Sequence, residues 1–288
     1  YLIERFVLMK NIETLVEDIY AAVDTGFEPT CEAMEDLLKS VSYSVTRQFS
    51  KKNRVERNTL RMSNIGKPEC QVWHEINGSS KEELRPDTRI KFLFGDLIEA
   101  LLIFLVKEAG HEVTHEQSGV QIDGIVGHTD CKIDGVTVDI KSASSYAFKK
   151  FEDGTLADND PFGYLAQISA YAHAAGDVEG GFLAMDKQMG KIAYLKVDEI
   201  DMINVPKRIK HLKEVVKSKT PPKRCFKAKA DGKSGNMKLD TNCSYCAFKE
   251  VCWSDANNGD GLRLFLYSNG PRWLTHVERE PDVHEVVN

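Results

Sequence analysis

The feature that most constrains the fold is a long apolar segment, FLFGDLIEALLIFLVKEAG, at residues 92–110. It is the clearest helix in the sequence, and Gly110 can end it. Apolar residues lie almost all round this helix, so we expect it to be buried. Its most apolar part carries Glu99, and no apolar run reaches the roughly 20 residues needed to cross a bilayer. We therefore expect a core helix of a globular domain and no membrane partner.

Segments of β character and further helices follow this segment. Three stretches, EVTHEQ, GVQIDGIVGHTD and GVTVDIKSAS, read as short strands, with turns at DGIVG and at Asp134-Gly135. Residues 160–176 favour a helix that stops at Gly176, 180–197 favour two strands, and 198–219 favour a helix that breaks at Pro206. The order of helix, strands, helix, strands and helix favours a mixed α/β or α+β core with helices on both faces.

The flanking segments predict three regions. Residues 1–50 read as mostly helical, with Thr30 as the cap of the second helix. We expect a surface loop at 79–89, a basic loop at 220–236 and a polar tail at the C-terminal end. The predicted division is an N-terminal helical segment at 1–60, a core at 61–240, and a cysteine cluster with the tail at 241–288.

Positive charge is concentrated in one stretch of an acidic chain. The formal net charge is -6, yet residues 207–238 hold twelve Lys and Arg against two acids, Glu214 and Asp231. This stretch is either a solvated helix face followed by a mobile loop or a surface that contacts phosphates. On the second interpretation, the candidate DNA-binding side chains are Lys207, Arg208 and Lys210.

The segment VDIKSAS at 138–144 places an acid and a base on one strand face. Side chains of a strand alternate, so Asp139 and Lys141 point to the same side. Asp130 lies nine residues before Asp139, and the turn at Asp134-Gly135 can pair the two segments. Two close carboxylates repel unless a cation lies between them, and hard divalent cations prefer such oxygen ligands. The alternative is a hairpin with these side chains in solvent.

Four motifs in order give this site a family resemblance. They are GDLIE at 95–99, GHTD at 127–130, DIK at 139–141 and QISAY at 167–171. Over residues 61–253 the chain resembles the PD-(D/E)XK nuclease superfamily. It is most similar to the RecB-like branch, which includes phage and CRISPR-associated exonucleases. The resemblance implies an α/β fold, with a restriction-endonuclease-like core of a mixed β-sheet flanked by helices at 61–240.

The resemblance also implies roles for individual residues. A Mg²⁺ or Mn²⁺ site would be formed by Glu99, Asp130, Asp139 and the Ile140 carbonyl. Lys141 would orient or activate the attacking water, and Gln167 and Tyr171 would position the DNA strand. Ser142 and Ser144 can donate hydrogen bonds to a phosphate or simply end the strand. His128 is a further candidate base, which we disfavour.

Seven cysteines without a secretory signal favour metal binding over a disulfide framework. Cys243, Cys246 and Cys252 form C-x2-C-x5-C, and the resemblance to RecB-like nucleases with an iron–sulfur cluster adds the upstream Cys70. It implies a [4Fe–4S] cluster that clasps the ends of the core. The alternatives are Cys225 as the fourth ligand and Zn²⁺ as the metal. We expect Cys31 and Cys131 in the core.

These predictions combine into one function. We expect a metal-dependent DNA exonuclease that acts on single strands or duplex ends. By analogy with phage members, its role would be recombination, repair or genome processing in the cytoplasm, which is the host cytoplasm for a phage-encoded protein. The alternatives are a non-catalytic iron–sulfur DNA-binding module of the same fold and a structure-specific endonuclease.

Overall fold

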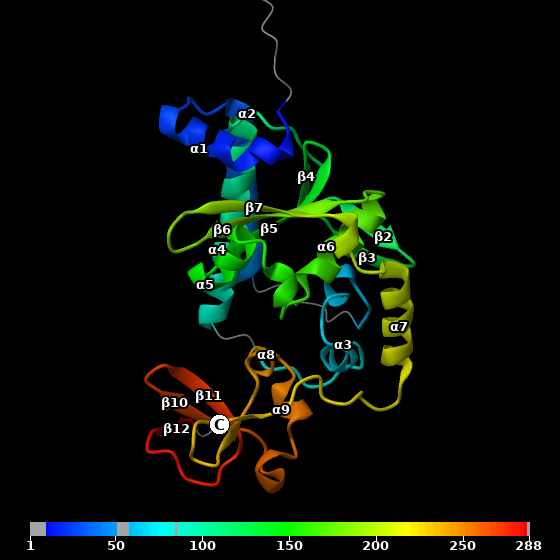
Figure 1. Ribbon diagram of the computed structural model, residues 1–288, viewed down its shortest axis with the longest axis vertical. Coiled ribbons are helices and arrows are strands. Elements are labelled where there is room, and N and C mark those ends of the chain that lie inside the picture. Colours follow the sequence, from blue (N-terminus) through cyan, green and yellow to red (C-terminus); the bar gives the residue numbers. More distant parts are fainter. Residues whose placement is uncertain (1–9, 51–57, 84–85, 287–288) are drawn as a thin grey trace, which may run out of the picture. The chain divides into compact units, whose positions relative to one another are not determined.

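The protein was analysed as a computed structural model that describes residues 10–50, 58–83 and 86–286. Its contacts divide the chain into two compact units. The first unit comprises 1–55, 61–65 and 84–206, and the second comprises 56–60, 66–83 and 207–288. Figure 1 shows the course of the chain through both units. The predicted division at residues 60 and 240 stays a prediction.

A mixed five-stranded sheet forms the centre of the first unit. Its order is β1-β4-β5-β6-β7, with bounds Val113–Thr114, Cys131–Ile133, Val136–Ala143, Gly180–Asp186 and Ile192–Val197. Strands β5 and β6 are parallel, and the other neighbours are antiparallel. A separate hairpin consists of β2 (Gly119–Ile122) and β3 (Ile125–His128). The predicted α/β fold with a mixed sheet between helices is therefore confirmed.

Helices cover both faces of this sheet because successive strand residues point to opposite sides. Val138 and Ile140 of β5 share an apolar core with Leu102 and Val106 of α4 (Pro86–Glu108). Ala143 shares a second core with residues of α5 (Ser145–Glu152) and α6 (Tyr164–Ala175). The helices α1 (Leu15–Thr25) and α5 lie on opposite sides of β7 (Figure 1), and α2 (Cys31–Phe49) packs along α4.

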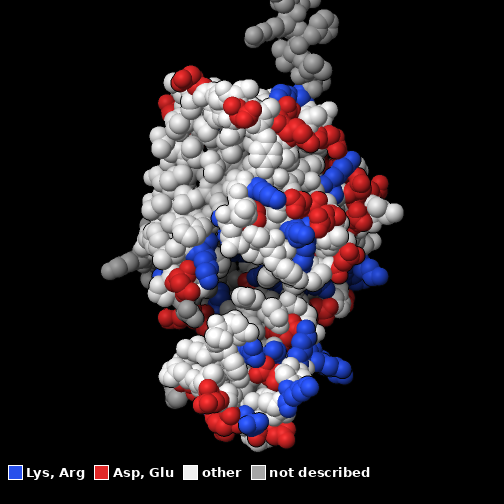
Figure 2. Space-filling model, turned by 60° about the vertical axis from the view of Figure 1, so that its left-hand side comes forward, with Lys and Arg blue, Asp and Glu red and all other residues white. Residues whose placement is uncertain are grey.

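The central helix departs from its prediction in two ways. It begins at Pro86, so the end of the predicted loop at 79–89 is helical, because Pro suits the first turn of a helix. It is also not buried all round, since Phe92, Phe94 and Leu101 are exposed. The sheet and α2 cover only part of its circumference. Figure 2 shows a broad face of the first unit with few charged side chains.

Local signals set the ends of several other helices. Thr30 Oγ1 accepts a hydrogen bond from Ala33 N, which confirms the predicted cap of α2. Gly176 ends α6 with a φ of 77°, a left-handed conformation that glycine adopts without strain. The predicted helix at 198–219 is interrupted just before Pro206, because a 3₁₀ turn at Glu199–Asp201 is followed by α7 (Val205–Lys217). Pro206 lies in the first turn of α7, where its missing N–H costs no intrahelical hydrogen bond. Short 3₁₀ turns lie at Ile12–Thr14, Met62–Asn64, Leu156–Asp158, Glu199–Asp201 and Ala256–Gly259.

The second unit contains a second sheet that the sequence analysis did not predict. Its order is β12-β10-β11-β9-β8, with bounds His284–Val286, Arg263–Tyr267, Gly270–His276, Met237–Lys238 and Lys229–Ala230. The helices α3 (Glu69–Ile76), α8 (Thr241–Ser244) and α9 (Lys249–Cys252) accompany it. The predicted polar tail is therefore wrong. Its strands bury Phe265 and Leu274, while charged side chains such as Arg263 and Glu285 pair with each other.

In the part of the chain that the structure describes, no helix has the length and apolar character needed to span a membrane.

Leu102→Ala should lower the free energy of unfolding by about 2–5 kcal/mol, because Leu102 is fully buried between α4 and the sheet. Its neighbour Leu101 is 39% exposed, so Leu101→Ala should change the same quantity by about 1 kcal/mol or less. Urea unfolding followed by circular dichroism measures both. Equal destabilisation by the two substitutions would contradict the packing described for α4.

Candidate active site

Strand β5 places Asp139 and Lys141 on the face that α5 and α6 cover. Asp139 is only 3% exposed, and its Oδ2 is in ion-pair contact with Lys141 Nζ. The ammonium also lies 4.7 Å from the centre of the Tyr164 ring. Burial alone would lower the pKa of Lys141, but the charges of Asp139 and Asp130 outweigh it and raise the pKa. Lys141 is therefore held in its charged form.

Asp130 reaches the same place from the connection between β3 and β4. Its Oδ2 accepts a hydrogen bond from Ile140 N at 2.8 Å, which ties it to β5. Burial raises the pKa of Asp130 well above its ordinary value, and the charges of Asp139 and Glu99 raise it further. The predicted pairing of the two segments is seen in the antiparallel contact of Cys131 with Val138.

Glu99 joins these two carboxylates from α4. Its Oε1 accepts a hydrogen bond from Gln117 Nε2 at 2.6 Å. Burial raises the pKa of Glu99, and the nearby charges of Asp96 and Asp139 add to the effect. Sequence reasoning missed Gln117, which has a φ of 47° in the turn before β2. No sequence signal points to this role, because a left-handed backbone conformation cannot be read from a residue other than glycine.

The donor set of this site fits a divalent cation. The charges of Asp139 and Glu99 raise the pKa of Asp130, the charge of Asp139 raises the pKa of Glu99, and Lys141 lies beside Asp139. Asp139 Oδ2 is buried, with the Lys141 ammonium against it. Carboxylate oxygens are the ligands that Mg²⁺ and Mn²⁺ prefer. Glu99, Asp130 and Asp139 are the side chains that would hold such an ion.

Gln167 and Tyr171 lie on one face of α6, as their spacing predicts. Gln167 Nε2 donates a hydrogen bond to Tyr171 OH at 3.2 Å, and burial raises the pKa of Tyr171. A Cβ atom on Gly127 of β3 would lie 3.0 Å from Tyr171 Cε1 and 2.7 Å from Met62 Cβ. Tyr171 therefore packs against the glycine of the GHTD motif and supports the strand that leads to Asp130.

The remaining predicted residues of the first unit have simpler surroundings. Ser144 Oγ accepts a hydrogen bond from Ala147 N and caps α5, so it ends the strand. Ser142 Oγ lies beside Gly95 of α4, and His128 is exposed on β3. The Ile140 amide donates a hydrogen bond to Asp130, and the role of the Ile140 carbonyl as a metal ligand stays a prediction.

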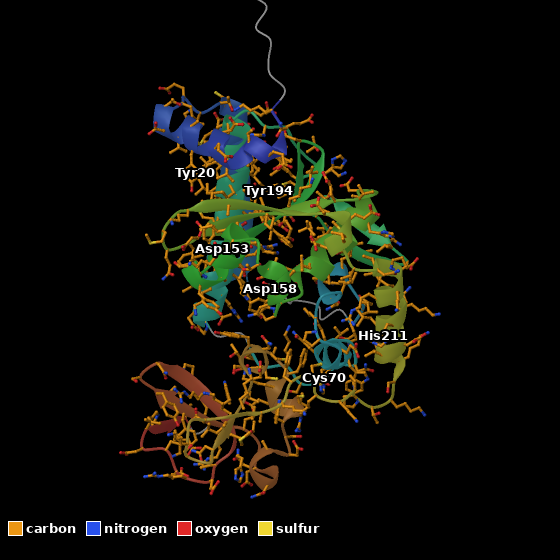
Figure 3. The ribbon with its side chains drawn as sticks, in the orientation of Figure 1. Tyr20, Cys70, Asp153, Asp158, Tyr194 and His211 are labelled. Atoms are coloured by element: carbon orange, nitrogen blue, oxygen red, sulfur yellow. The ribbon has the colours of Figure 1, made fainter. Side chains whose placement is uncertain are left out.

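Three of the four predicted DNA-binding residues, Lys207, Arg208 and Lys210, lie on α7, and the fourth, Ser142, lies on β5. Arg208 is engaged within the second unit, where its guanidinium donates to Glu69 Oε1 at 3.2 Å and to Lys67 O at 2.9 Å. His211, one turn further along, lies 2.8 Å from the same Glu69 oxygen (Figure 3). Lys207 and Lys210 are exposed. The role of this helix in DNA binding stays a prediction.

The predicted cysteine ligands line one cavity of the second unit. Cys70 of α3 (labelled in Figure 3) has its Sγ 3.6 Å from Cys252 Sγ, and none of the cysteines is in a disulfide. His74, one turn after Cys70, brings a ring nitrogen within 4.8 Å of these two sulfurs. The sulfur-bearing and imidazole residues around the cavity are Cys70, His74, Cys225, Cys243, Cys246 and Cys252.

Burial and contacts among these thiols shift their pKa values in different directions. Burial raises the pKa of Cys243 to about 11 and also raises that of Cys246. The hydrogen bond from Cys70 lowers the pKa of Cys252 to about 7, with help from Arg224. Buried thiolates need a compensating cation. Sequence reasoning missed His74, although its i+4 spacing from Cys70 was readable.

The two remaining cysteines lie in the first unit. Cys131 is fully buried in β4, as predicted. The prediction for Cys31 is wrong, because it is exposed at the first position of α2, directly after the cap residue Thr30.

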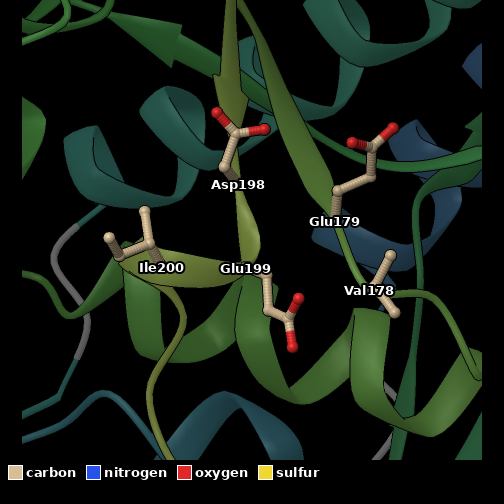
Figure 4. Close-up of a pocket in the computed structure, with 5 residues that line it drawn as sticks. All are labelled: Val178, Glu179, Asp198, Glu199 and Ile200. Carbon is tan, nitrogen blue, oxygen red and sulfur yellow. The ribbon is translucent and has the colours of Figure 1, made fainter.

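A surface hollow of the first unit, with a volume of about 460 Å³, is lined by none of the predicted site residues. Figure 4 shows it, and it is lined by Val178, Glu179, Asp198, Glu199 and Ile200. Two of its acids are already paired, because Lys196 Nζ lies 3.0 Å from Glu179 and 3.2 Å from Asp198. Its exposed carboxylates stay hydrated, so it lacks the enclosed acid cluster of β5.

Comparisons with known proteins give one extensive match. A family model described as the PD-(D/E)XK nuclease superfamily matches residues 17–253, more than half of the 288-residue chain. No curated protein matches. Among solved structures, that of SSO0001 is 14% identical with a TM-score of 0.43, covering 78% of this chain and 98% of that one.

Two further structures are of an alkaline exonuclease, LHK-Exo, from Laribacter hongkongensis. The first is 13% identical with a TM-score of 0.39 and covers 56% of this chain and 90% of that one. The second, in complex with dAMP, is 14% identical with a TM-score of 0.36 and covers 56% and 85%. At these low TM-scores, the roles of residues are argued from the chain's own geometry.

Gly127→Ala should destabilise the protein by about 1–3 kcal/mol, because the added Cβ collides with Met62 and Tyr171. Gly95→Ala is the matched control from the other glycine motif. Its Cβ would meet only Ser142 Oγ, at an ordinary 3.7 Å, and alanine favours a helix. Thermal unfolding of both variants measures the difference. A Gly95→Ala variant that is the less stable of the two would contradict this packing.

Glu99→Gln should stabilise the metal-free protein at neutral pH. The raised pKa means that the folded state holds its proton more tightly than the unfolded state, so ionisation destabilises the fold as the pH rises. The amide removes this loss and can still accept from Gln117. Melting temperatures from pH 4 to pH 8 should show a gain that grows with pH and shrinks on adding Mg²⁺. A constant difference across this range would contradict the account.

Proposed function

The chain belongs to the PD-(D/E)XK nuclease superfamily, and on this premise we propose that it is a divalent-metal-dependent DNA exonuclease. The observation that carries the proposal is a cluster of acids in which Asp139 contacts Lys141 and the charges of Asp139 and Glu99 raise the pKa of Asp130. Lys141 lies against a buried oxygen of Asp139, and burial also raises the pKa of Glu99, so a divalent cation would offset the negative charge that this cluster holds.

The chain's own residues divide the work of hydrolysis between them. Asp130 and Asp139, with Glu99, would hold the metal and fix it against β5. A bound Mg²⁺ or Mn²⁺ supplies polarisation of the scissile phosphate and a coordinated water of lowered pKa. Lys141, held protonated by its neighbours, orients this water and offsets the negative charge that develops on the phosphate. Gln167 and Tyr171 position the strand at the mouth of the site.

We also propose the substrate and setting that the family resemblance implies. The substrate is DNA, either single-stranded or at duplex ends, and Lys207 and Lys210 of α7 are candidate phosphate contacts. The role is phage-type recombination, repair or genome processing in the cytoplasm. A non-catalytic binding module is disfavoured because Asp130, Asp139 and Lys141 are all present. An endonuclease would nick closed circular DNA, whereas an exonuclease that needs a DNA end would leave it intact.

For the second unit we propose a [4Fe–4S] cluster held by Cys70, Cys243, Cys246 and Cys252. These residues line a common cavity, and the short sulfur-to-sulfur distance between Cys70 and Cys252 supports shared ligation. The alternatives are Cys225 as a ligand and Zn²⁺ held by three of the thiols with His74. In each case the centre joins α3 to the segment from 243 to 252.

Asp139→Asn should abolish cleavage of end-labelled DNA in Mg²⁺ or Mn²⁺, because it removes the charge of a metal ligand. Lys141→Met should lower kcat about 10²- to 10³-fold, the range for losing one charge-stabilising donor. Asp198→Asn, an exposed acid of the same unit, is the matched control and should leave the rate unchanged. Nicking of closed circles identifies an endonuclease. A wild type that cleaves no DNA, or an active Asp139→Asn variant, sinks the proposal.

Iron and acid-labile sulfide should be present at about four of each per chain after purification without oxygen, with a broad visible absorbance. Cys243→Ser should lose both, whereas Cys31→Ser, at an exposed site in the other unit, should keep them. Cys225→Ser and His74→Ala decide between the ligand sets. Zinc at full occupancy with no iron would refute the cluster and favour the zinc alternative.

A further inference from the structure

A row of aromatic rings extends from Lys141 to the surface of the first unit. The Tyr164 ring lies over the Lys141 ammonium at 4.7 Å. The Phe162 ring follows, with its centre 5.6 Å from that of Tyr164 and an angle of 32° between the planes. Phe162 is 52% exposed, although a large apolar side chain is favoured in the interior. The outer end of the row therefore offers an uncovered ring face close to the proposed catalytic group.

A second exposed ring lies on the helix that follows the catalytic strand. Tyr146 of α5 is 79% exposed, and Lys150 Nζ lies 5.9 Å from the centre of its ring. The same Nζ donates a hydrogen bond to Asn159 O at 2.7 Å. Lys150 thus links the face of α5 that bears Tyr146 to the connection that bears Phe162. We define Tyr146, Phe162 and Tyr164 as the aromatic wall.

Helix α4 contributes exposed rings beside its own site residue. Phe92 is 47% exposed and precedes Glu99 by seven residues, which is two helical turns, so both lie on one helix face. The rise of a helix places them about 10 Å apart along its axis. Phe94, two residues after Phe92 on the same helix, is 53% exposed. Exposed rings therefore occur on the α4 element of the site as well as on the aromatic wall.

The charges around the aromatic wall argue against a grip on duplex DNA. Residues 145–163 contain two lysines, at 149 and 150, and four acids, Glu152, Asp153, Asp158 and Asp160. Asp153 and Asp158, both exposed, are labelled in Figure 3 on this connection. A duplex presents phosphates outward and is held by Lys and Arg, whereas on this surface the acids outnumber the two lysines. A single strand presents its bases, which stack on aromatic side chains regardless of sequence.

We propose that the aromatic wall binds unpaired nucleotides, whose bases stack on Phe162 and Tyr146 while the backbone passes Lys141 and the carboxylates. This inference rests on the proposed nuclease function and specifies its substrate as single-stranded DNA of any sequence. The net acidic charge of residues 145–163 favours an orientation with the bases toward the aromatic wall and the phosphates toward Lys141. Tyr164 keeps Phe162 in place and is a positioning residue.

Binding can be measured apart from cleavage by placing each variant in the Asp139→Asn background. The probes are fluorescently labelled oligothymidine and a blunt duplex of equal length, with anisotropy as the readout. Phe162→Ala should weaken binding of the single strand about 5- to 100-fold, the range for loss of one base stack. Phe162→Trp restores a ring and should bind within about twofold of the Asp139→Asn parent. Ile200→Ala, an exposed apolar residue outside the wall, is the matched control and should have no effect.

Two further measurements test base stacking on the aromatic wall independently of the proposed nuclease activity. An oligonucleotide with abasic sites should bind the parent weakly and be insensitive to Phe162→Ala. Duplex binding should be unchanged by the same substitution. If Phe162→Ala binds oligothymidine like the parent, or weakens single strand and duplex equally, the inference is overturned even when the wild type cleaves DNA. If the wild type cleaves nothing while Phe162→Ala still loses single-strand affinity, the nuclease proposal fails and the aromatic wall stands.

Discussion

Mutual repulsion among Glu99, Asp130 and Asp139 is the constraint on which the first unit depends. Burial and the neighbouring charges raise the pKa of Glu99 and Asp130, so the fold keeps acids where their ionisation is unfavourable. Apolar packing between α4 and β5 stabilises the fold against this unfavourable free energy. Lys141 offsets part of the charge and is itself held protonated. Such a cluster is useful to the protein when a divalent cation completes it.

Much of this arrangement was predictable because it follows from short-range rules. The alternation of β5 places Asp139 and Lys141 together, and the turn at Asp134-Gly135 brings β4 alongside. The helix at 92–110 and the stop at Gly176 follow from composition and from the special conformation of glycine. Asp130, Asp139 and Glu99 interact as the ordered motifs suggested, although their catalytic roles are proposals.

Other features depend on contacts that no local pattern reveals. Gln117 reaches Glu99, and Tyr164 covers Lys141, through tertiary placement of a turn and of the start of a helix. The C-terminal sheet was missed because its short strands bury few residues and carry charged ones such as Arg263 and Glu285, which made the segment read as a polar tail. The two glycine motifs also differ in a way that spacing cannot show. Gly127 is required by a close approach, whereas Gly95 has ordinary space around it.

The central claim is that the carboxylates of the first unit share one divalent cation, and a crystal soaked in Mn²⁺ tests it directly. Anomalous scattering should reveal an ion about 2.1–2.2 Å from carboxylate oxygens of Asp130 and Asp139. Lys141 Nζ should then move away from the Asp139 oxygen that it now contacts. Density for Mn²⁺ elsewhere on the protein, with the Lys141–Asp139 pair intact and no ion between the two acids, would contradict the account.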